Sequence, residues 1–192
     1  MTKRGSWITG IVLAGLAAFG SAAQAAPNLV TNGGFETGDF TGWTGTGDTS
    51  FSGVQCPGSD PSVFEGSCSA FFGALSAPSG IQQVINVGGA GQYWDLSFAF
   101  QADGGIPSSF SVTFGGQTLL SLTNPPEASN TLYHFSGVTT GPNMTLAFNF
   151  LDPVGFLFLD AVSVSAIPEP ATTSLLGAGL AALIFWKRRK SA

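Results

Sequence analysis

Apolar and polar residues alternate along several short stretches in the middle of this chain. One stretch sets Trp94, Leu96, Phe98 and Phe100 against Asp95, Ser97 and Gln101. The same period of two recurs around residues 109–114 and 144–150. Successive side chains of a strand point to opposite faces of a sheet, so this alternation predicts half-buried β-strands.

Glycine and proline pairs separate these stretches, and no stretch of the middle has a sustained helical period. The pairs are Gly88-Gly89, Gly104-Gly105, Gly115-Gly116 and Pro125-Pro126. Short strands joined by such turns are typical of two antiparallel sheets packed face to face. The sequence therefore predicts an all-β fold, an antiparallel β-sandwich.

The basic residues divide the chain into three segments. All six lie near the ends: Lys3, Arg4, Lys187, Arg188, Arg189 and Lys190. Each cluster borders an apolar run, and the segment between them contains no Lys or Arg. We expect residues 26–166 to form one domain, because about 140 residues can bury a core of their own.

Residues 1–25 have the composition of a secretory signal peptide. Lys3 and Arg4 precede an apolar run from Ile8 to Phe19, and Ala23-Gln24-Ala25 has small residues where signal peptidase requires them. The run of about 12 residues is shorter than the roughly 20 that span a bilayer as a helix. We expect an N-terminal signal helix cleaved after Ala25; the alternative is an uncleaved anchor.

Residues 167–192 contain three elements in a fixed order. Pro168, Glu169 and Pro170 come first, an apolar run over 171–186 follows, and the basic cluster Lys187, Arg188, Arg189 and Lys190 comes last. A helix of 16 residues reaches about 24 Å, somewhat less than the ~30 Å hydrocarbon core, so snorkelling lysines and local thinning complete the span. We expect a C-terminal transmembrane helix with its basic end in the cytoplasm and the domain outside.

This order resembles the PEP-CTERM sorting tail of Gram-negative bacteria. The resemblance implies that a membrane-embedded cysteine protease, an exosortase, removes the tail and passes the protein to the cell surface or beyond. It also implies a producer of exopolysaccharide and only a transient attachment to the membrane. The alternative is a permanent C-terminal anchor.

The beginning and end of the middle segment resemble those of galactose-binding-like jelly rolls, the fold of many carbohydrate-binding modules. The matching residues are Asn32, Gly34, Phe35, Glu36, Gly42 and Trp43 at the beginning, with Asp160 and Val162 at the end. The resemblance implies a jelly-roll topology. It also implies a structural Ca²⁺ between Glu36 and Asp160.

The carboxylates of the middle segment have no cationic side chain to pair with. Ten of the chain's eleven acidic residues lie there, because only Glu169 falls outside it. A buried carboxylate must then be protonated, bonded to backbone donors or bound to a metal ion. Asp160 is in phase with Val162 and Val164, which predicts that it points inward if those valines face the core. The alternative to Ca²⁺ is that backbone N–H groups satisfy Asp160 while Glu36 is solvated.

Cys56 and Cys68 are the two cysteines of the chain, and both lie in the segment that we expect to be exported. An even number of cysteines in an oxidising compartment predicts a disulfide. The alternative is two free thiols.

The sequence gives little indication of catalysis. His134 is the single histidine, and no G-x-S-x-G elbow, metalloprotease helix or phosphate loop is present. The absence of Lys and Arg argues against chemistry on phosphates and against nucleic-acid binding. We predict that the protein is not an enzyme.

The aromatic residues suggest possible contacts with glycans. Trp43 and Trp94 are expected in the core, whereas Tyr93 and Tyr133 are better placed to face solvent. The first interpretation is a non-catalytic cell-surface or extracellular-matrix protein associated with exopolysaccharide. The alternative is a specific carbohydrate-binding module with a defined sugar site.

Overall fold

The structure is a computed structural model that describes residues 26–56 and 61–167, together with residues 179 and 187. The expected signal peptide and the motif at Pro168, Glu169 and Pro170 lie outside the described residues, as does nearly all of the expected transmembrane helix. Within the described part of the chain, no helix is long and apolar enough to cross a membrane.

Eight strands make up the domain, and every pairing between them is antiparallel. They are β1 (Thr44–Thr46), β2 (Phe51–Gln55), β3 (Ser69–Asn86), β4 (Tyr93–Ala102), β5 (Ser109–Phe114), β6 (Gln117–Thr123), β7 (Ala128–Val138) and β8 (Asn143–Ile167). The prediction of an all-β, antiparallel fold is confirmed.

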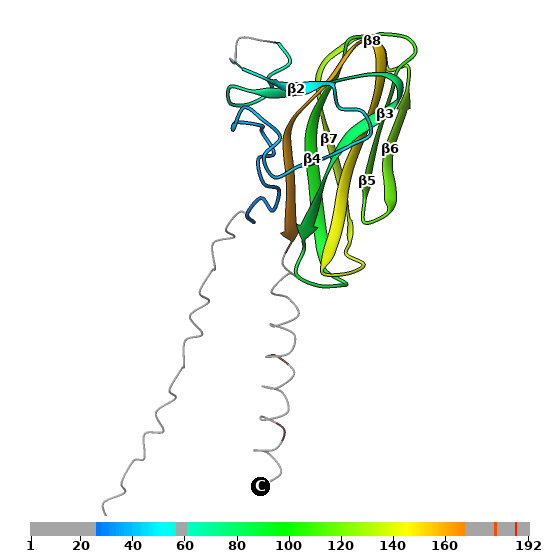
Figure 1. Cartoon of the computed structure of the whole chain (residues 1–192). Helices are drawn as coiled ribbons and strands as arrows, with labels where there is room; N and C mark the ends of the chain where they lie inside the picture. Colours follow the sequence, from blue (N-terminus) through cyan, green and yellow to red (C-terminus); the bar gives the residue numbers. More distant parts are fainter. Residues whose placement is uncertain (1–25, 57–60, 168–178, 180–186, 188–192) are drawn as a thin grey trace, which may run out of the picture.

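Two long strands, β3 and β8, each contribute to both layers of the domain. The first part of β8, residues 146–151, pairs with β5, whereas residues 157–167 pair with β4. Strand β3 changes register against β8 between Phe72 and Ser79. One layer therefore has the order β2-β3-β8-β4-β7 and the other β1-β3-β8-β5-β6, with β3 and β8 contributing to both (Figure 1).

Aromatic side chains fill the space between the layers. Strands β4 and β5 are not paired, yet Phe100 stacks on Phe110 with ring centroids 4.0 Å apart, and Trp94 meets Phe114 at 4.9 Å. Phe98 contacts Phe148 of β8 at 5.2 Å. The large apolar residues of the alternating stretches are buried, as is Trp43. The alternation therefore predicted the core correctly.

The sandwich has two distinct ends. Strand β8 finishes at one of them, where the loops 87–92 and 139–142 also lie; we call this the tail end. At the opposite end, which we call the far end, β4 leads into loop 103–108 and β8 bends through residues 152–156. Figure 1 shows the tail end below, at the arrowhead of β8.

Candidate functional site

The Asp160 carboxylate is bonded entirely to backbone N–H groups. Its Oδ2 accepts hydrogen bonds from the amides of Phe64 at 2.7 Å and Glu65 at 3.1 Å, and Oδ1 accepts one from Ala161 at 2.6 Å. The side chain has no exposed surface. Three amide donors compensate the charge of a buried carboxylate where no cationic side chain is available.

Asp160 does not point into the core, and that part of the prediction is wrong. It pairs with Ala99, which lies on the face opposite Phe98 and Phe100. A register shift between Ser97 and Ala99 accompanies a positive φ of 53° at Ala161. This bulge puts Asp160 out of phase with the buried Val162. Asp160 is buried because the loop containing Phe64 and Glu65 covers the outer face.

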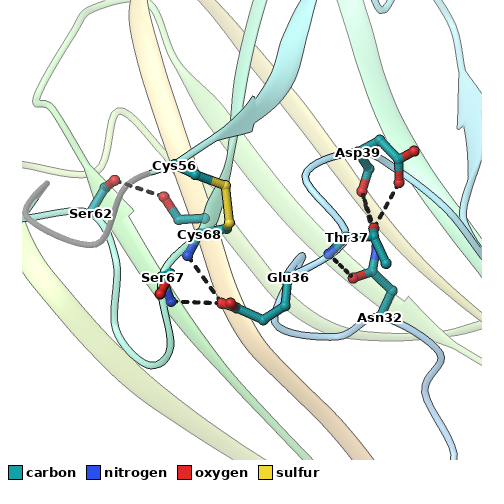
Figure 2. Close-up of a disulfide and its surroundings, with 9 residues drawn as sticks. Asn32, Glu36, Thr37, Asp39, Cys56, Ser62, Ser67 and Cys68 are labelled. Atoms are coloured by element: carbon teal, nitrogen blue, oxygen red, sulfur yellow. Dashed lines mark hydrogen bonds between the residues drawn. A yellow bond between two sulfur atoms is a disulfide. The ribbon is translucent and has the colours of Figure 1, made fainter.

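Glu36 binds the same loop a few residues further on. Its Oε1 accepts hydrogen bonds from the amides of Ser67 at 2.9 Å and Cys68 at 3.0 Å, as Figure 2 shows. Gly66 has a φ of 71°, so a side chain there would be strained, and its Cβ would displace the Glu36 carboxylate. We call Glu36, Asp160 and the five residues 64–68 the carboxylate clamp. Glu36 is therefore bonded to protein and not simply solvated.

A disulfide joins the clamped loop to β2. Cys56 follows β2 and is bonded to Cys68, with 4.5 Å between their Cα atoms (Figure 2). Beside it the hydroxyl groups of Ser62 and Ser69 lie 2.8 Å apart. The predicted disulfide is confirmed, and it acts on the same loop as the two carboxylates.

Residues 32–43, at the beginning of the domain, hold Glu36 in place. Asn32 donates from Nδ2 to the carbonyls of Asp39 and Thr41, and its own carbonyl accepts the Trp43 indole N–H at 3.1 Å. Phe35 is fully buried and stacks on Trp43 with centroids 6.0 Å apart. These contacts fix the turn from which the Glu36 side chain reaches the loop.

The clamp was also the predicted calcium site. Side-chain atoms of Glu36, Glu65 and Asp160 all come within 4 Å of a Cβ built on Gly34. Among the described residues, however, no three His, Cys, Asp or Glu side chains are close enough together to hold a metal ion. Backbone amides occupy both oxygens of Asp160 and Oε1 of Glu36. Calcium at this pair stays a prediction.

A second pair of carboxylates, not anticipated from the sequence, lies at the far end. Asp103 accepts hydrogen bonds from Gly105 and Phe156, and Asp152 accepts them from Val154 and Gly155. Burial, together with the neighbouring Asp103 carboxylate, raises the pKa of Asp152. The pair fastens the β4–β5 loop to the bend of β8. Asp103 and Asp152 are brought together by the pairing of β4 with β8, so nothing in the local sequence pattern predicts that they are neighbours.

Tyr133 lines a hollow of about 270 Å³ at the edge of the sandwich. It pairs with Phe98 and stacks on it, with centroids 5.4 Å apart, so it lies on the inner face of β7. Tyr133 faces solvent only in part, because its ring is half-buried against the core while it lines this hollow. The hollow is also lined by Phe100, Ala102, Leu122, Thr123, Asn124, Pro125, Pro126, Ala128 and Thr131.

Tyr93 and Tyr133 do not form one aromatic platform. Tyr93 is the first residue of β4, is exposed as expected, and pairs with Val138 on the outer face. Tyr133 lies five residues before Val138, roughly 16 Å along the strand at about 3.3 Å per residue, and on the inner face. His134, next to it, is exposed on the outer face opposite Ser97.

Residues 166–190 match the PEP-CTERM protein-sorting motif. This motif implies export and C-terminal processing by an exosortase. It covers only the end of the chain, and the expected motif residues Pro168, Glu169 and Pro170 lie inside it. No curated protein matches the chain.

The domain is similar in fold to carbohydrate-binding modules of known structure. TmCBM61, solved in complex with β-1,4-galactotriose, is 16% identical with a TM-score of 0.56, over 74% of this chain and 100% of that one. The CBM22-1 xylan-binding domain of Paenibacillus barcinonensis Xyn10C is 18% identical with a TM-score of 0.53, over 77% and 99%. The chain has the fold of these β-sandwiches.

An enzyme domain has a similar fold. The enzymatically active domain of tailspike protein 4 from bacteriophage CBA120 is 19% identical with a TM-score of 0.56, over 73% of this chain. The match spans only 21% of that tailspike chain. The similar structures are therefore mostly binding modules, and the shared fold alone does not assign an activity.

The clamp predicts an unusual dependence of stability on pH. Burial raises the pKa of Asp160 from 3.8 to about 6, in spite of the three amide donors. The folded state then binds more protons than the unfolded state between these values, so the free energy of unfolding falls as pH rises through this window. We expect a loss of about 2–3 kcal/mol from this group.

Urea unfolding of the wild type and Asp160→Asn at a series of pH values checks this prediction. The variant carries no titrating group at this position, so its stability should fall less steeply between pH 4 and 6. Asp152→Asn is the matched control. Because it retains Asp160, its free energy of unfolding should still fall with pH by the amount that Asp160 contributes. Equal slopes in the wild type and Asp160→Asn would contradict the assignment.

Proposed function

We propose that this protein is a non-catalytic, exported cell-surface or extracellular-matrix protein that associates with exopolysaccharide. The observation that carries the proposal is a PEP-CTERM sorting motif following directly on a sandwich with the fold of carbohydrate-binding modules. Signal peptidase and an exosortase process its two ends. The C-terminal segment holds it in the membrane until processing.

The bonding of the acidic residues supports a non-catalytic role. A glycosidase needs two carboxyl groups that face the substrate, one to donate a proton and one to act as base or nucleophile. In this domain Glu36, Asp103, Asp152 and Asp160 use their oxygens to fasten loops through backbone amides. Their arrangement serves the structure of the domain.

A defined sugar site is the second candidate function, and the hollow at Tyr133 favours it. The hollow combines aromatic and proline surfaces with the hydroxyl groups of Thr123, Thr131 and Tyr133. Ligand pockets typically pair an apolar lining with a few polar groups that orient the ligand. At about 270 Å³ the hollow suits one or two sugar rings of a longer chain.

Exosortase processing predicts a shorter mature chain. Intact mass spectrometry of the protein isolated from the producer should show a C-terminus that lacks the basic cluster at residues 187–190. Glu169→Ala should block processing and leave the full tail, whereas Ser165→Ala, outside the matched motif, should be processed normally. A mature chain that still carries Lys190 would instead identify a permanent anchor.

Binding to the producer's own exopolysaccharide tests the sugar site. We expect saturable binding of the isolated mature protein, competed by one defined sugar. Tyr133→Ala should weaken it by about tenfold, or 1.4 kcal/mol. Tyr93→Ala, on the other face of the sheet, is the matched control and should bind normally. A folded protein that binds no polysaccharide would rule out both forms of the proposal.

We also propose that Ca²⁺ binds between Glu36 and Asp160, where it would supply the positive charge that the domain lacks. Carboxylates and carbonyl oxygens are the ligands that Ca²⁺ prefers. Added Ca²⁺ should raise the melting temperature of the wild type, and Asp160→Ala should abolish the rise. Asp160→Ala also leaves the amides of Phe64 and Glu65 without their acceptor. The quantity to compare is therefore the rise in melting temperature on adding Ca²⁺, and not the melting temperature itself. Identical melting with Ca²⁺ and with a chelator would disprove the site.

A further inference from the structure

Three apolar side chains form an exposed row across the tail end. Tyr93 of β4 pairs with Val138 of β7 on one side and with Ile167 of β8 on the other. Directly paired residues share a face, so the three side chains lie next to one another on the outer face. Their exposed fractions are 52%, 50% and 42%. The core of the domain therefore does not account for this apolar row.

The loops beside this row carry no charged residue. Loop 87–92 and loop 139–142 consist of Val, Gly, Ala, Gln, Thr and Pro. They are bonded to each other, because the amide of Gly91 donates to the carbonyl of Thr139 and the amide of Thr139 to that of Gln92, each at 2.8 Å. The two loops of the tail end are thus uncharged and are held together by hydrogen bonds.

Three acidic residues lie at the opposite end of the sandwich from the row. Asp103 and Asp152 lie at the far end, and Glu127 immediately precedes Ala128, which pairs with the last residue of β4. Two carboxylates are close to the row in sequence: Asp95, two residues after Tyr93 on the same face of β4, and Glu169, two residues after Ile167. An anionic lipid surface repels carboxylates, so the carboxylates gathered at the far end favour an orientation with the tail end toward the membrane.

The length of chain between the sheet and the apolar run brings the tail end to the bilayer. Ile167 is still paired in the sheet, and the apolar run begins at Ala171. Four residue steps span at most about 14 Å when fully extended. The headgroup region of each leaflet is itself roughly 5–8 Å thick. A membrane-inserted tail leaves no room for a long aqueous gap between the sandwich and the lipid.

We propose that the row formed by Tyr93, Val138 and Ile167 is a membrane-contact surface, which rests in the headgroup region of the outer leaflet while the tail is in the bilayer. Tyrosine beside aliphatic side chains suits this region, since its ring is apolar and its hydroxyl group stays hydrated. The inference rests on the proposed function, because it needs the tail inserted in the membrane.

Lipid-borne quenchers test the contact in the full-length chain. The protein is reconstituted into vesicles of phosphatidylethanolamine and phosphatidylglycerol that contain a headgroup-proximal spin-labelled lipid. An environment-sensitive fluorophore is placed on Val138→Cys at the tail end or on Val154→Cys at the far end, both exposed valines. We expect a blue-shifted emission and about twofold or greater quenching at position 138, and neither at position 154.

Two further measurements separate the possible failures. Flotation of the protein with the vesicles at high salt reports insertion of the tail; without flotation, the proposed function fails and the contact with it. Flotation without quenching at position 138 overturns the contact alone. Adding Tyr93→Ser and Ile167→Ser to Val138→Cys should reduce the quenching. Undiminished quenching in that variant would show that the inserted C-terminal segment brings the tail end near the lipid without contact by the row. That result would overturn the proposal.

Discussion

The absence of Lys and Arg between residues 5 and 186 determines how the charges of this domain are compensated. A carboxylate that leaves water needs donors or a counter-ion, and no cationic side chain can supply one. The backbone supplies the donors. Three amides meet Asp160, two meet Glu36, and further amides meet Asp103 and Asp152.

Because the donors are backbone amides of loops, the acidic residues also hold those loops in place. Glu36 and Asp160 come from opposite ends of the domain sequence and hold the same five-residue loop, which the Cys56–Cys68 disulfide fixes at its end. Asp103 and Asp152 do the same at the far end for the β4–β5 loop and the bend of β8. The two uncharged loops of the tail end are held together by backbone bonds instead.

The sequence predicted the fold and the core well, because period-two alternation is a local property that the sheet preserves. It placed Phe98, Phe110 and Phe148 inside the sandwich, and it paired the two cysteines. It failed at Asp160, because a single residue with positive φ, Ala161, shifts the phase of the strand. It placed Tyr133 at the surface, whereas the ring is half-buried because it lies opposite Phe98 on the inner face of β7. The face that a residue occupies depends on bulges and on pairing between distant segments, and a local sequence pattern carries no information about either.

The position of β8 has a consequence for the order in which the domain can form. Both layers include β8, and the amide of Leu29, near the start of the domain, donates to the carbonyl of Val164 at 2.7 Å. A chain that crosses a membrane from its N-terminus delivers this strand last. The sandwich then lacks one of the two strands that contribute to both layers, β8, until nearly the whole domain has emerged. In a chain exported from its N-terminus, closure of the domain would therefore coincide with the arrival of the sorting motif at the membrane.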